Sequence, residues 1–316
     1  MDTTQIITAF ISVGLIGAIF GAVLAYASKV FHVEVDPKVE KIADILPQAN
    51  CGACAYAGCA DYADAVVTKG ADITLCSPGG QDVIDQIAEI LGTNAEAGKA
   101  MVAYCACNGT KENAKDRFEY YGPKSCSDAA FVSGGQKACD YGCLGFGECV
   151  EACAFGAMYM DDNGLPVVID EKCVGCGACV RACPKDVMKM MPKDSKVYIA
   201  CNSKAKGKEV SDACKVGCIG CKICTLPNTT PSGALKMEGD LPVINFDVVD
   251  DLVAAKFKCP KSCFVDKGDA EKTPELVAKE KAEWKAIEAE KTAAKKKAAL
   301  EKAAAAKAAK EAEGNS

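Results

Sequence analysis

The longest hydrophobic run of the chain lies close to its first residue. Residues Ile6 to Ala27 read IITAFISVGLIGAIFGAVLAYA and contain no charged side chain. At about 1.5 Å per residue, a helix of this length spans a hydrocarbon core of about 30 Å. A secretory signal peptide is the alternative, but the run is longer than the apolar part of such peptides and no basic residue precedes it. The pattern therefore predicts a transmembrane anchor over residues 1–28.

Charges on the two sides of this run differ. Lys29 and Lys38 follow it, whereas Asp2 is the only charged residue before it. Lysines gather on the cytoplasmic side of membrane helices. We therefore expect a single-pass protein of the cell inner (cytoplasmic) membrane, in contact with membrane lipid, whose remaining domains lie on the cytoplasmic side.

Shorter patterns follow a linker at residues 29–45. Apolar side chains recur at helical spacing over residues 82–103, which we expect to form an amphipathic helix. Residues 166–170 follow the turn dipeptide Asn163-Gly164 and are expected to form a hairpin strand. Helices mixed with short hairpins predict an α+β fold.

The last part of the chain, residues 267–316, is rich in Ala, Lys and Glu. This composition favours a helix that is solvated on most sides. We expect a helical tail that is either flexible or docked on a partner. A solubilising extension without a specific role is the alternative.

Composition adds one strong signal, which is 22 cysteines among 316 residues. Disulfide frameworks belong to small secreted domains, whereas C-x-x-C-x-x-C runs followed by proline belong to thiolates on iron. The single histidine, His32, excludes histidine-rich zinc sites and haem with paired histidines. A net charge of −6 argues against a nucleic-acid partner. Iron–sulfur chemistry is therefore expected.

The clearest motif is CVGCGACVRACP, which starts at residue 173. In ferredoxin runs of this spacing, three thiolates bind one 4Fe-4S cluster and the fourth binds a second cluster, so a partner run must exist. ACDYGCLGFGECVEAC provides it, although Phe146 stands where a regular run has a ligand. We expect Cys139, one turn upstream, to replace it. The crossed pairing gives one cluster on Cys139, Cys143, Cys149 and Cys183, and another on Cys153, Cys173, Cys176 and Cys179.

Two further cysteine groups are expected to hold one 4Fe-4S cluster each. The first is Cys51, Cys54, Cys59 and Cys76, for which structural zinc is the alternative. The second lies in a repeat, because ACKVGCIGCKIC resembles ACDYGCLGFGEC and LPVINFD resembles LPVVID. In this repeat Asn228 replaces one ligand, and the other run lacks its first three. The four that remain would serve a single cluster: Cys218, Cys221, Cys224 and Cys259.

Six cysteines have no assignment: Cys105, Cys107, Cys126, Cys201, Cys214 and Cys263. Two interpretations stay open. In one, some of these bind a fifth cluster, with Cys107, Cys126, Cys201 and Cys214 as the candidate ligands. In the other, they are buried thiols that bind no iron. Four clusters are expected, or five under the first interpretation.

The motifs divide the chain after the anchor and linker. The expected segments are a small helical 4Fe-4S domain (46–80), a helical or α+β connecting region (81–135), a two-cluster ferredoxin-like (βαβ)2 module (136–195), a second module with one cluster (196–266) and the tail (267–316).

This order of parts resembles the B subunit of the Rnf complex, a membrane ferredoxin:NAD oxidoreductase that pumps sodium ions or protons. The resemblance covers roughly residues 1–265 and is most specific at NCGACAYAGC and KACDYGCLGFGECVEAC. It implies a subunit that accepts electrons from reduced soluble ferredoxin and relays them to other Rnf membrane and peripheral subunits for NAD reduction. Asn228 and the incomplete last run depart from members with two full ferredoxin modules.

The sequence has no G-x-G-x-x-G dinucleotide fingerprint, no P-loop, and no marked acid–base pair or nucleophile. We therefore expect no catalytic residue and no NAD or flavin site on this chain, so the translocase activity belongs to the complex. Two other functions fit the same cysteines. One is an iron–sulfur subunit of another membrane reductase or hydrogenase, and the other is a cluster-based redox sensor.

Overall fold

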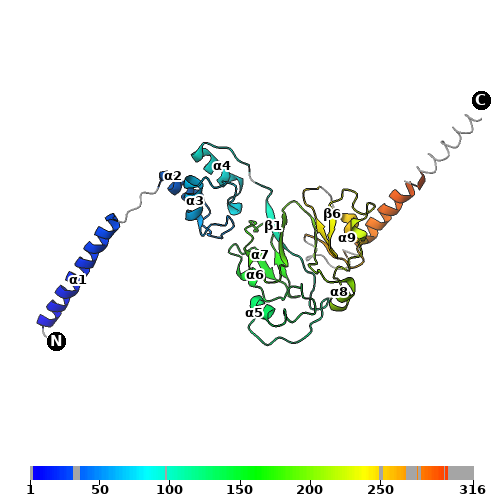
Figure 1. Ribbon diagram of the computed structural model, residues 1–316, viewed down its shortest axis with the longest axis horizontal. Coiled ribbons are helices and arrows are strands. Elements are labelled where there is room, and N and C mark those ends of the chain that lie inside the picture. The colour runs from blue at the N-terminus through cyan, green and yellow to red at the C-terminus, as the bar shows by residue number, and fades with distance from the viewer. Residues whose placement is uncertain are drawn as a thin grey trace, which may run out of the picture.

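The computed structural model describes residues 3–30, 36–96, 98–248, 252–267, 276, 279–294 and 296–297. Along the chain, Figure 1 shows a long helix, a small helical domain, and then two units that combine short strands with helices. Helical residues near the C-terminus follow these units. The fold is α+β, as the hydrophobic pattern predicted.

The long helix α1 (Thr3–Val30) contains the uncharged run. Its apolar side chains are exposed, and Phe10 and Tyr26 expose 77% and 73% of their surface. Among the described residues, Phe10–Val30 is the one segment whose length and mean hydropathy of 2.2 suit a membrane span. A helix with apolar side chains on every side requires apolar surroundings, and lipid would provide them.

A small helical domain follows α1. Its elements are α2 (Pro37–Ile45), α3 (Cys59–Thr68), the 3-10 turn η1 (Ser77–Gly79) and α4 (Gly80–Leu91). The Asp36 carboxylate caps α2 by accepting a hydrogen bond of 2.8 Å from the backbone N–H of Lys38. The three helices share one core, whose largest fully buried side chains are Ile42, Tyr62, Ile84 and Ile87.

The helix expected over residues 82–103 is shorter than predicted. α4 ends at Leu91, because Gly92 adopts left-handed backbone angles (φ 70°) and its N–H bonds back to the last turn. Residues Met101–Cys105 form strand β1 instead. The prediction was therefore wrong in its C-terminal half. α4 also packs with α2 and α3, although the sequence placed it in the connecting region.

The first mixed unit consists of two antiparallel strand pairs and two short helices. Its elements are β1 (Met101–Cys105) paired with β4 (Met188–Pro192), β2 (Met158–Met160) paired with β3 (Pro166–Val168), α6 (Glu148–Glu151) and α7 (Ala178–Arg181). The hairpin strand expected at residues 166–170 is confirmed as β3. The additional helix α5 (Cys126–Phe131) lies in the segment between β1 and α6. Because β1 pairs with β4, this unit recruits a strand from before residue 136.

The second mixed unit repeats this pairing. Its elements are β5 (Val197–Ile199) paired with β8 (Phe264–Asp266), β6 (Leu235–Glu238) paired with β7 (Leu241–Ile244), α8 (Gly207–Ala213), the 3-10 turn η2 (Ile223–Thr225) and α9 (Val253–Lys258). Its core contains Val197, Leu235, Ala255 and Phe264 together with several cysteines. The repeat seen in the sequence is thus a repeat of the fold.

Backbone hydrogen bonds join the two mixed units. The N–H of Asn108 donates to the carbonyl of Ala200 at 3.0 Å, and the N–H of Lys215 donates to the carbonyl of Asn113 at 2.8 Å. Residues 279–294 are helical, and Trp284 packs on Phe257 of α9 with ring centroids 5.4 Å apart. The helical prediction for the tail is therefore confirmed for this segment. Residues 298–316 lie outside the described part of the chain.

Candidate metal sites

Four small cavities of nearly equal size lie in the three folded parts, and cysteines line each of them. Their volumes are about 340 Å³ in the helical domain, about 330 Å³ and 360 Å³ in the first mixed unit, and about 360 Å³ in the second. Each cavity has at least four cysteines on its wall, and the remaining lining is mostly backbone and apolar side chains.

The cavity of the helical domain is lined by Cys51, Cys54, Cys59 and Cys76. The Asn50 side chain shapes its loop, because its Oδ1 accepts a hydrogen bond of 2.8 Å from the N–H of Cys59. A Cβ at Gly58 would come within 2.8 Å of the same Oδ1. A larger residue at this position would therefore have to displace the Asn50 amide from its hydrogen bond with Cys59. All four cysteines that the sequence grouped here are brought together.

The first cavity of the first mixed unit is lined by Cys153, Cys173, Cys176 and Cys179. Cys153 follows α6, whereas the other three lie in the loop before α7 and in α7 itself. The N–H of Ala157 donates to the Cys153 sulfur at 3.4 Å. Burial raises the pKa of the Cys179 thiol to about 11. This group also matches the set expected from the crossed pairing.

The second cavity of this unit differs from the expected set in one cysteine. Cys143, Cys149 and Cys183 line it as expected, but the fourth cysteine on its wall is Cys126, not Cys139. The N–H of Val187 donates to the Cys183 sulfur at 3.4 Å. Burial raises the pKa of the Cys149 thiol to about 12.

Cys139 lies toward the second mixed unit. Burial raises the pKa of its thiol, the N–H of Tyr141 lowers it by hydrogen bonding to the sulfur, and interaction with Cys214 raises it further. The sequence favoured Cys139 because it is the nearest cysteine upstream of the ligand run. Two features of the sequence indicated a different ligand set: Cys126 had no assignment, and Phe146 stands at a ligand position of the run.

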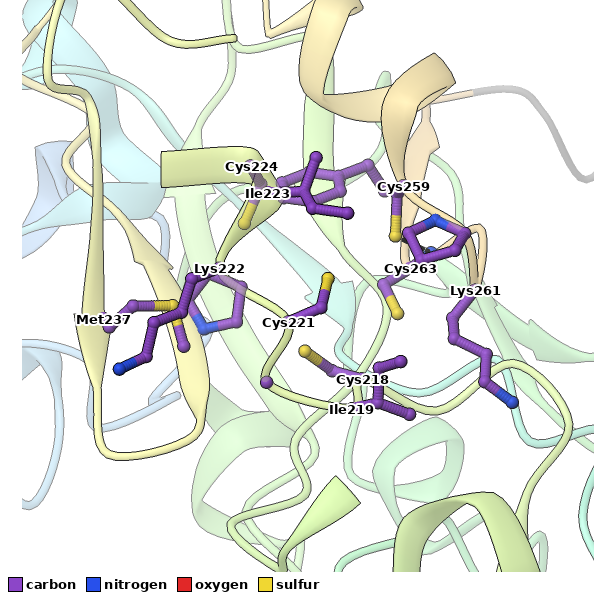
Figure 2. A pocket seen from close by; sticks show the side chains of 14 residues that line it. Cys218, Ile219, Cys221, Lys222, Ile223, Cys224, Met237, Cys259, Lys261 and Cys263 are labelled. Atoms are coloured by element: carbon purple, nitrogen blue, oxygen red, sulfur yellow. Dashed lines mark hydrogen bonds between the residues drawn. The ribbon is translucent and has the colours of Figure 1, made fainter. Parts of the chain in front are cut away.

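The cavity of the second mixed unit is lined by five cysteines. Figure 2 shows the sulfur atoms of Cys218, Cys221, Cys224, Cys259 and Cys263 around one space. The Cys263 thiol, as a hydrogen-bond partner of either sulfur, lowers the pKa of Cys218 to about 7 and that of Cys259 to about 6. The four expected cysteines are together, and Cys263 joins them.

Two matching cysteines lie beside these cavities. The Cys107 sulfur accepts hydrogen bonds from the N–H groups of Cys143 and Gly109, at 3.4 and 3.3 Å. The Cys201 sulfur accepts one from the N–H of Cys218 at 3.3 Å. Burial raises the pKa of Cys107 to about 12 and that of Cys201 to about 11. Each thiol thus supports the loop that carries a cavity cysteine.

The four cavities suit a 4Fe-4S cube rather than one compact ion. Within the described ranges, no three His, Cys, Asp or Glu side chains form a group close enough to hold a single metal ion. A cube instead needs four thiolates spread around a larger volume, with N–H donors to their sulfurs, and both features are present.

An arginine connects the helical domain to the first mixed unit. Arg181 of α7 donates from Nη2 to the carbonyl oxygen of Cys51 at 2.9 Å and from Nη1 to that of Cys176 at 3.1 Å. Cys51 and Cys176 line different cavities. One side chain therefore holds two cysteine loops against each other.

Two family models match parts of the chain. One, described as "Putative Fe-S cluster", matches residues 46–78, and the other, described as a 4Fe-4S dicluster domain, matches residues 138–188. The first range contains all four cysteines of the helical-domain cavity. The second contains both cysteine runs of the first mixed unit but not Cys126.

Three relatives are similar over most of the chain. The B subunit of a proton-translocating ferredoxin:NAD(+) oxidoreductase complex from Clostridium ljungdahlii is 45% identical over 78% of this chain and 87% of its own length. The B subunit of a Na(+)-translocating ferredoxin:NAD(+) oxidoreductase complex from Acetobacterium woodii is 40% identical over 82% and 76%. The B subunit of an ion-translocating oxidoreductase complex from Methanosarcina acetivorans is 37% identical over 78% and 92%.

Proposed function

Because this chain belongs to the B-subunit family of Rnf-type ion-translocating ferredoxin:NAD+ oxidoreductase complexes, we propose that it carries electrons from reduced soluble ferredoxin through four 4Fe-4S clusters to partner subunits. The chain is one subunit of a multisubunit membrane complex, and its iron–sulfur domains serve electron transfer. The observation that carries the number of clusters is the set of four similar cavities, each lined by at least four cysteines.

Three ligand sets follow from agreement between cysteine spacing and cavity lining. They are Cys51, Cys54, Cys59 and Cys76; Cys153, Cys173, Cys176 and Cys179; and Cys218, Cys221, Cys224 and Cys259. When bound, a 4Fe-4S cluster supplies a one-electron carrier. The protein supplies thiolates, burial and N–H donors to sulfur, which set the potential at which each cluster accepts its electron.

The cluster sites of the helical domain and of the first mixed unit are neighbours in this electron-transfer path. Arg181 holds the loop of Cys51 against the loop of Cys176, so the first two clusters would be adjacent. The two cavities of the first mixed unit are lined by cysteines of the same two runs, so we expect their clusters to be neighbours. We infer a path from the cluster of the helical domain to the cluster at Cys176 and then to the other cluster of the first mixed unit. The fourth cluster lies in the second mixed unit.

The membrane attachment belongs to α1. Its exposed apolar side chains support a single-pass anchor in the cytoplasmic membrane, with lipid contact, and Lys29 in the last turn supports a cytoplasmic location for the folded units. Deleting residues 1–30 should move the chain to the soluble fraction without changing its iron content. A deleted chain that still sediments with membranes would contradict this role.

Ion translocation is a property of the whole complex. One of the relatives named above is a subunit of a proton-translocating complex and another is a subunit of a Na(+)-translocating complex. We propose that this chain contributes electrons to NAD reduction coupled to transport of one of these ions, and that NAD and flavin bind to partner subunits. The family relationship favours this function over a subunit of another reductase or hydrogenase and over a redox sensor.

The test is iron and acid-labile sulfide per chain in the anaerobically purified full-length protein, with reduction by ferredoxin followed in the same sample. We expect about 16 iron and rapid reduction, since each cluster holds four iron atoms. About 20 iron would indicate a fifth cluster on cysteines that line none of the four cavities, for which Cys107, Cys201 and Cys214 were candidates from the sequence. Far less iron, or no reduction by ferredoxin, would contradict the proposed relay.

A further inference from the structure

The first cysteine run of the first mixed unit lacks one regular ligand. A ferredoxin run places ligands at the first, fourth and seventh positions, and Phe146 occupies the middle one between Cys143 and Cys149. The Phe146 ring packs against Tyr120, with centroids 5.6 Å apart. Phenylalanine offers no donor to iron, so the ligand must come from elsewhere in the chain.

Cys126 occupies the neighbourhood that the missing ligand would occupy. It lines the same cavity as Cys143, Cys149 and Cys183. Burial raises the pKa of its thiol, while the backbone N–H groups of Glu148 and Phe146 lower it by hydrogen bonding to the sulfur. The Cys126 sulfur therefore lies next to the loop of Phe146, where a regular ferredoxin run has its middle cysteine.

A cluster of hydrogen bonds fixes Cys126 in this place. Glu148, the first residue of α6, accepts from the Ser125 hydroxyl at 2.6 Å, from the Ser127 N–H at 3.0 Å and from the Ser127 hydroxyl at 2.8 Å. The two serines flank Cys126, and Glu148 precedes Cys149 directly. Because hydrogen bonds to a charged group are stronger than neutral ones, the carboxylate ties α5 to α6.

Contacts with Arg117 hold the segment around Cys139 away from this cavity. Arg117 donates from Nε to the carbonyl of Lys137 at 2.8 Å and forms an ion pair with Asp140. Cys139, which lies between these two partners of Arg117, does not line the cavity. To reach the cavity, Cys139 would have to break these contacts.

We propose that Cys126, rather than Cys139, supplies the fourth thiolate of the cluster held by Cys143, Cys149 and Cys183. The proposal rests on the proposed function, because it assumes that the cavity holds a 4Fe-4S cluster. Each of the four thiols loses its proton to solvent as its sulfur binds iron, and the phenyl ring of Phe146 takes no part. The cluster is then bound by ligands from three separate segments of the chain instead of two.

The test compares Cys126→Ser with Cys139→Ser in the full-length chain, by iron and sulfide content and by electron paramagnetic resonance of the reduced protein. We expect Cys126→Ser to lose about four iron, or to keep the cluster with an altered spectrum and potential, while the signals of the other clusters remain. Cys139→Ser should keep the wild-type iron content and spectrum. The reverse result, or equal loss in both variants, would overturn the proposal.

A rescue variant separates a lost ligand from a misfolded domain. Cys126→Ser combined with Phe146→Cys restores a regular ferredoxin run, so it should recover the iron content that Cys126→Ser loses. Failure to recover would overturn the proposal. Wild-type iron near 16 with rapid reduction by ferredoxin would support the proposed function whichever variant loses its cluster, so the two claims fail separately.

Discussion

In three cavities, the residue four positions after Cys153, Cys183 or Cys259 makes the same contact. Ala157, Val187 and Cys263 each donate their N–H to the sulfur of the preceding cysteine at 3.4 Å, and each lines the cavity. The Cys263 sulfur also lies 3.3 Å from the carbonyl oxygen of Val216, which is a further acceptor within reach of its one S–H. Cys263 therefore has the position of an apolar lining residue, although its side chain could bind iron.

We expect Cys263→Val to keep all the iron, because valine is the residue at the matching position 187 and lines a cavity of about the same volume there. Cys221→Ser should lose about four iron, because Cys221 is one of the four expected ligands of that cavity. Iron and sulfide content, with visible absorbance, would measure both. A loss of iron in Cys263→Val would show that it is a ligand and would contradict the assignment of this cavity.

At the scale of elements, a glycine lets the cysteine loop of α7 pack on strand β1. Gly175 has a φ of +70°, and a Cβ there would lie 2.7 Å from the carbonyl oxygen of Met101. Gly233 has a similar φ of +72°, with no atom within 4 Å of the added Cβ. Alanine at either position introduces backbone strain, but only Gly175→Ala adds a clash with a neighbouring element.

We therefore expect Gly175→Ala to cost about 2 kcal/mol more than Gly233→Ala. This difference corresponds to a melting temperature lower by about 8–16 °C for a unit of roughly 60–100 residues. The measurement is the temperature at which cluster absorbance is lost in each variant. Equal temperatures for the two variants would mean that the loop does not need its close approach to β1.

The contact between α7 and the helical domain also belongs to this scale. We expect Arg181→Gln to keep the full iron content. It should weaken the magnetic interaction between two reduced clusters, the one in the helical domain and the one at Cys176. Of its two hydrogen bonds, only the one to Cys51 crosses to the helical domain. Loss of that bond would lower the population of the docked arrangement by about tenfold, because a hydrogen bond to a charged group contributes about 1.5 kcal/mol or more.

Electron paramagnetic resonance of the partially reduced protein and the rate of electron passage from ferredoxin would measure this effect. Lys172→Gln is the matched control, since it removes an exposed positive charge next to Cys173 without touching the contact. If both variants behave like wild type, Arg181 has no role in holding the two clusters together.

For the molecule as a whole, the folded parts differ in what fills their cores. The core of the helical domain is centred on Ile42, Tyr62, Ile84 and Ile87. That core includes one buried cavity cysteine, Cys76, whereas the cores of the mixed units include several, among them Cys149, Cys179, Cys218 and Cys224. The strands around them have only three to five residues each. Clusters bound to these cysteines would therefore supply a large part of the packing in the mixed units.

Removing iron with a chelator under reducing conditions should consequently loosen the mixed units more than the helical domain. Hydrogen exchange should accelerate by about tenfold or more at the amides of β1 to β8, and less at those of α3 and α4. Mass spectrometry of the full-length protein before and after iron removal would resolve the two regions. Uniform acceleration, or none, would contradict a cluster-dependent core in the mixed units.

The sequence by itself determined the features that depend on local spacing. The uncharged run before Lys29 fixes a long apolar helix, and cysteines at spacings of three residues fix iron–sulfur loops, because the residues involved are neighbours along the chain. The turn dipeptide ahead of residues 166–170 likewise indicated a hairpin strand. The repeat in cysteine and LPV motifs indicated two related units, because similar local patterns favour similar folds.

Only the tertiary structure decided the partners that are distant in sequence. It paired β1 with β4 across the whole first unit, ended α4 at Gly92, and brought Cys126 rather than Cys139 to the second cavity. Proximity along the chain is a weak guide to such contacts, because the entropy of closing a loop grows only slowly with its length. Ser125 and Ser127 donate hydrogen bonds to Glu148, which hold Cys126 near the cavity, and no local sequence pattern reveals these contacts.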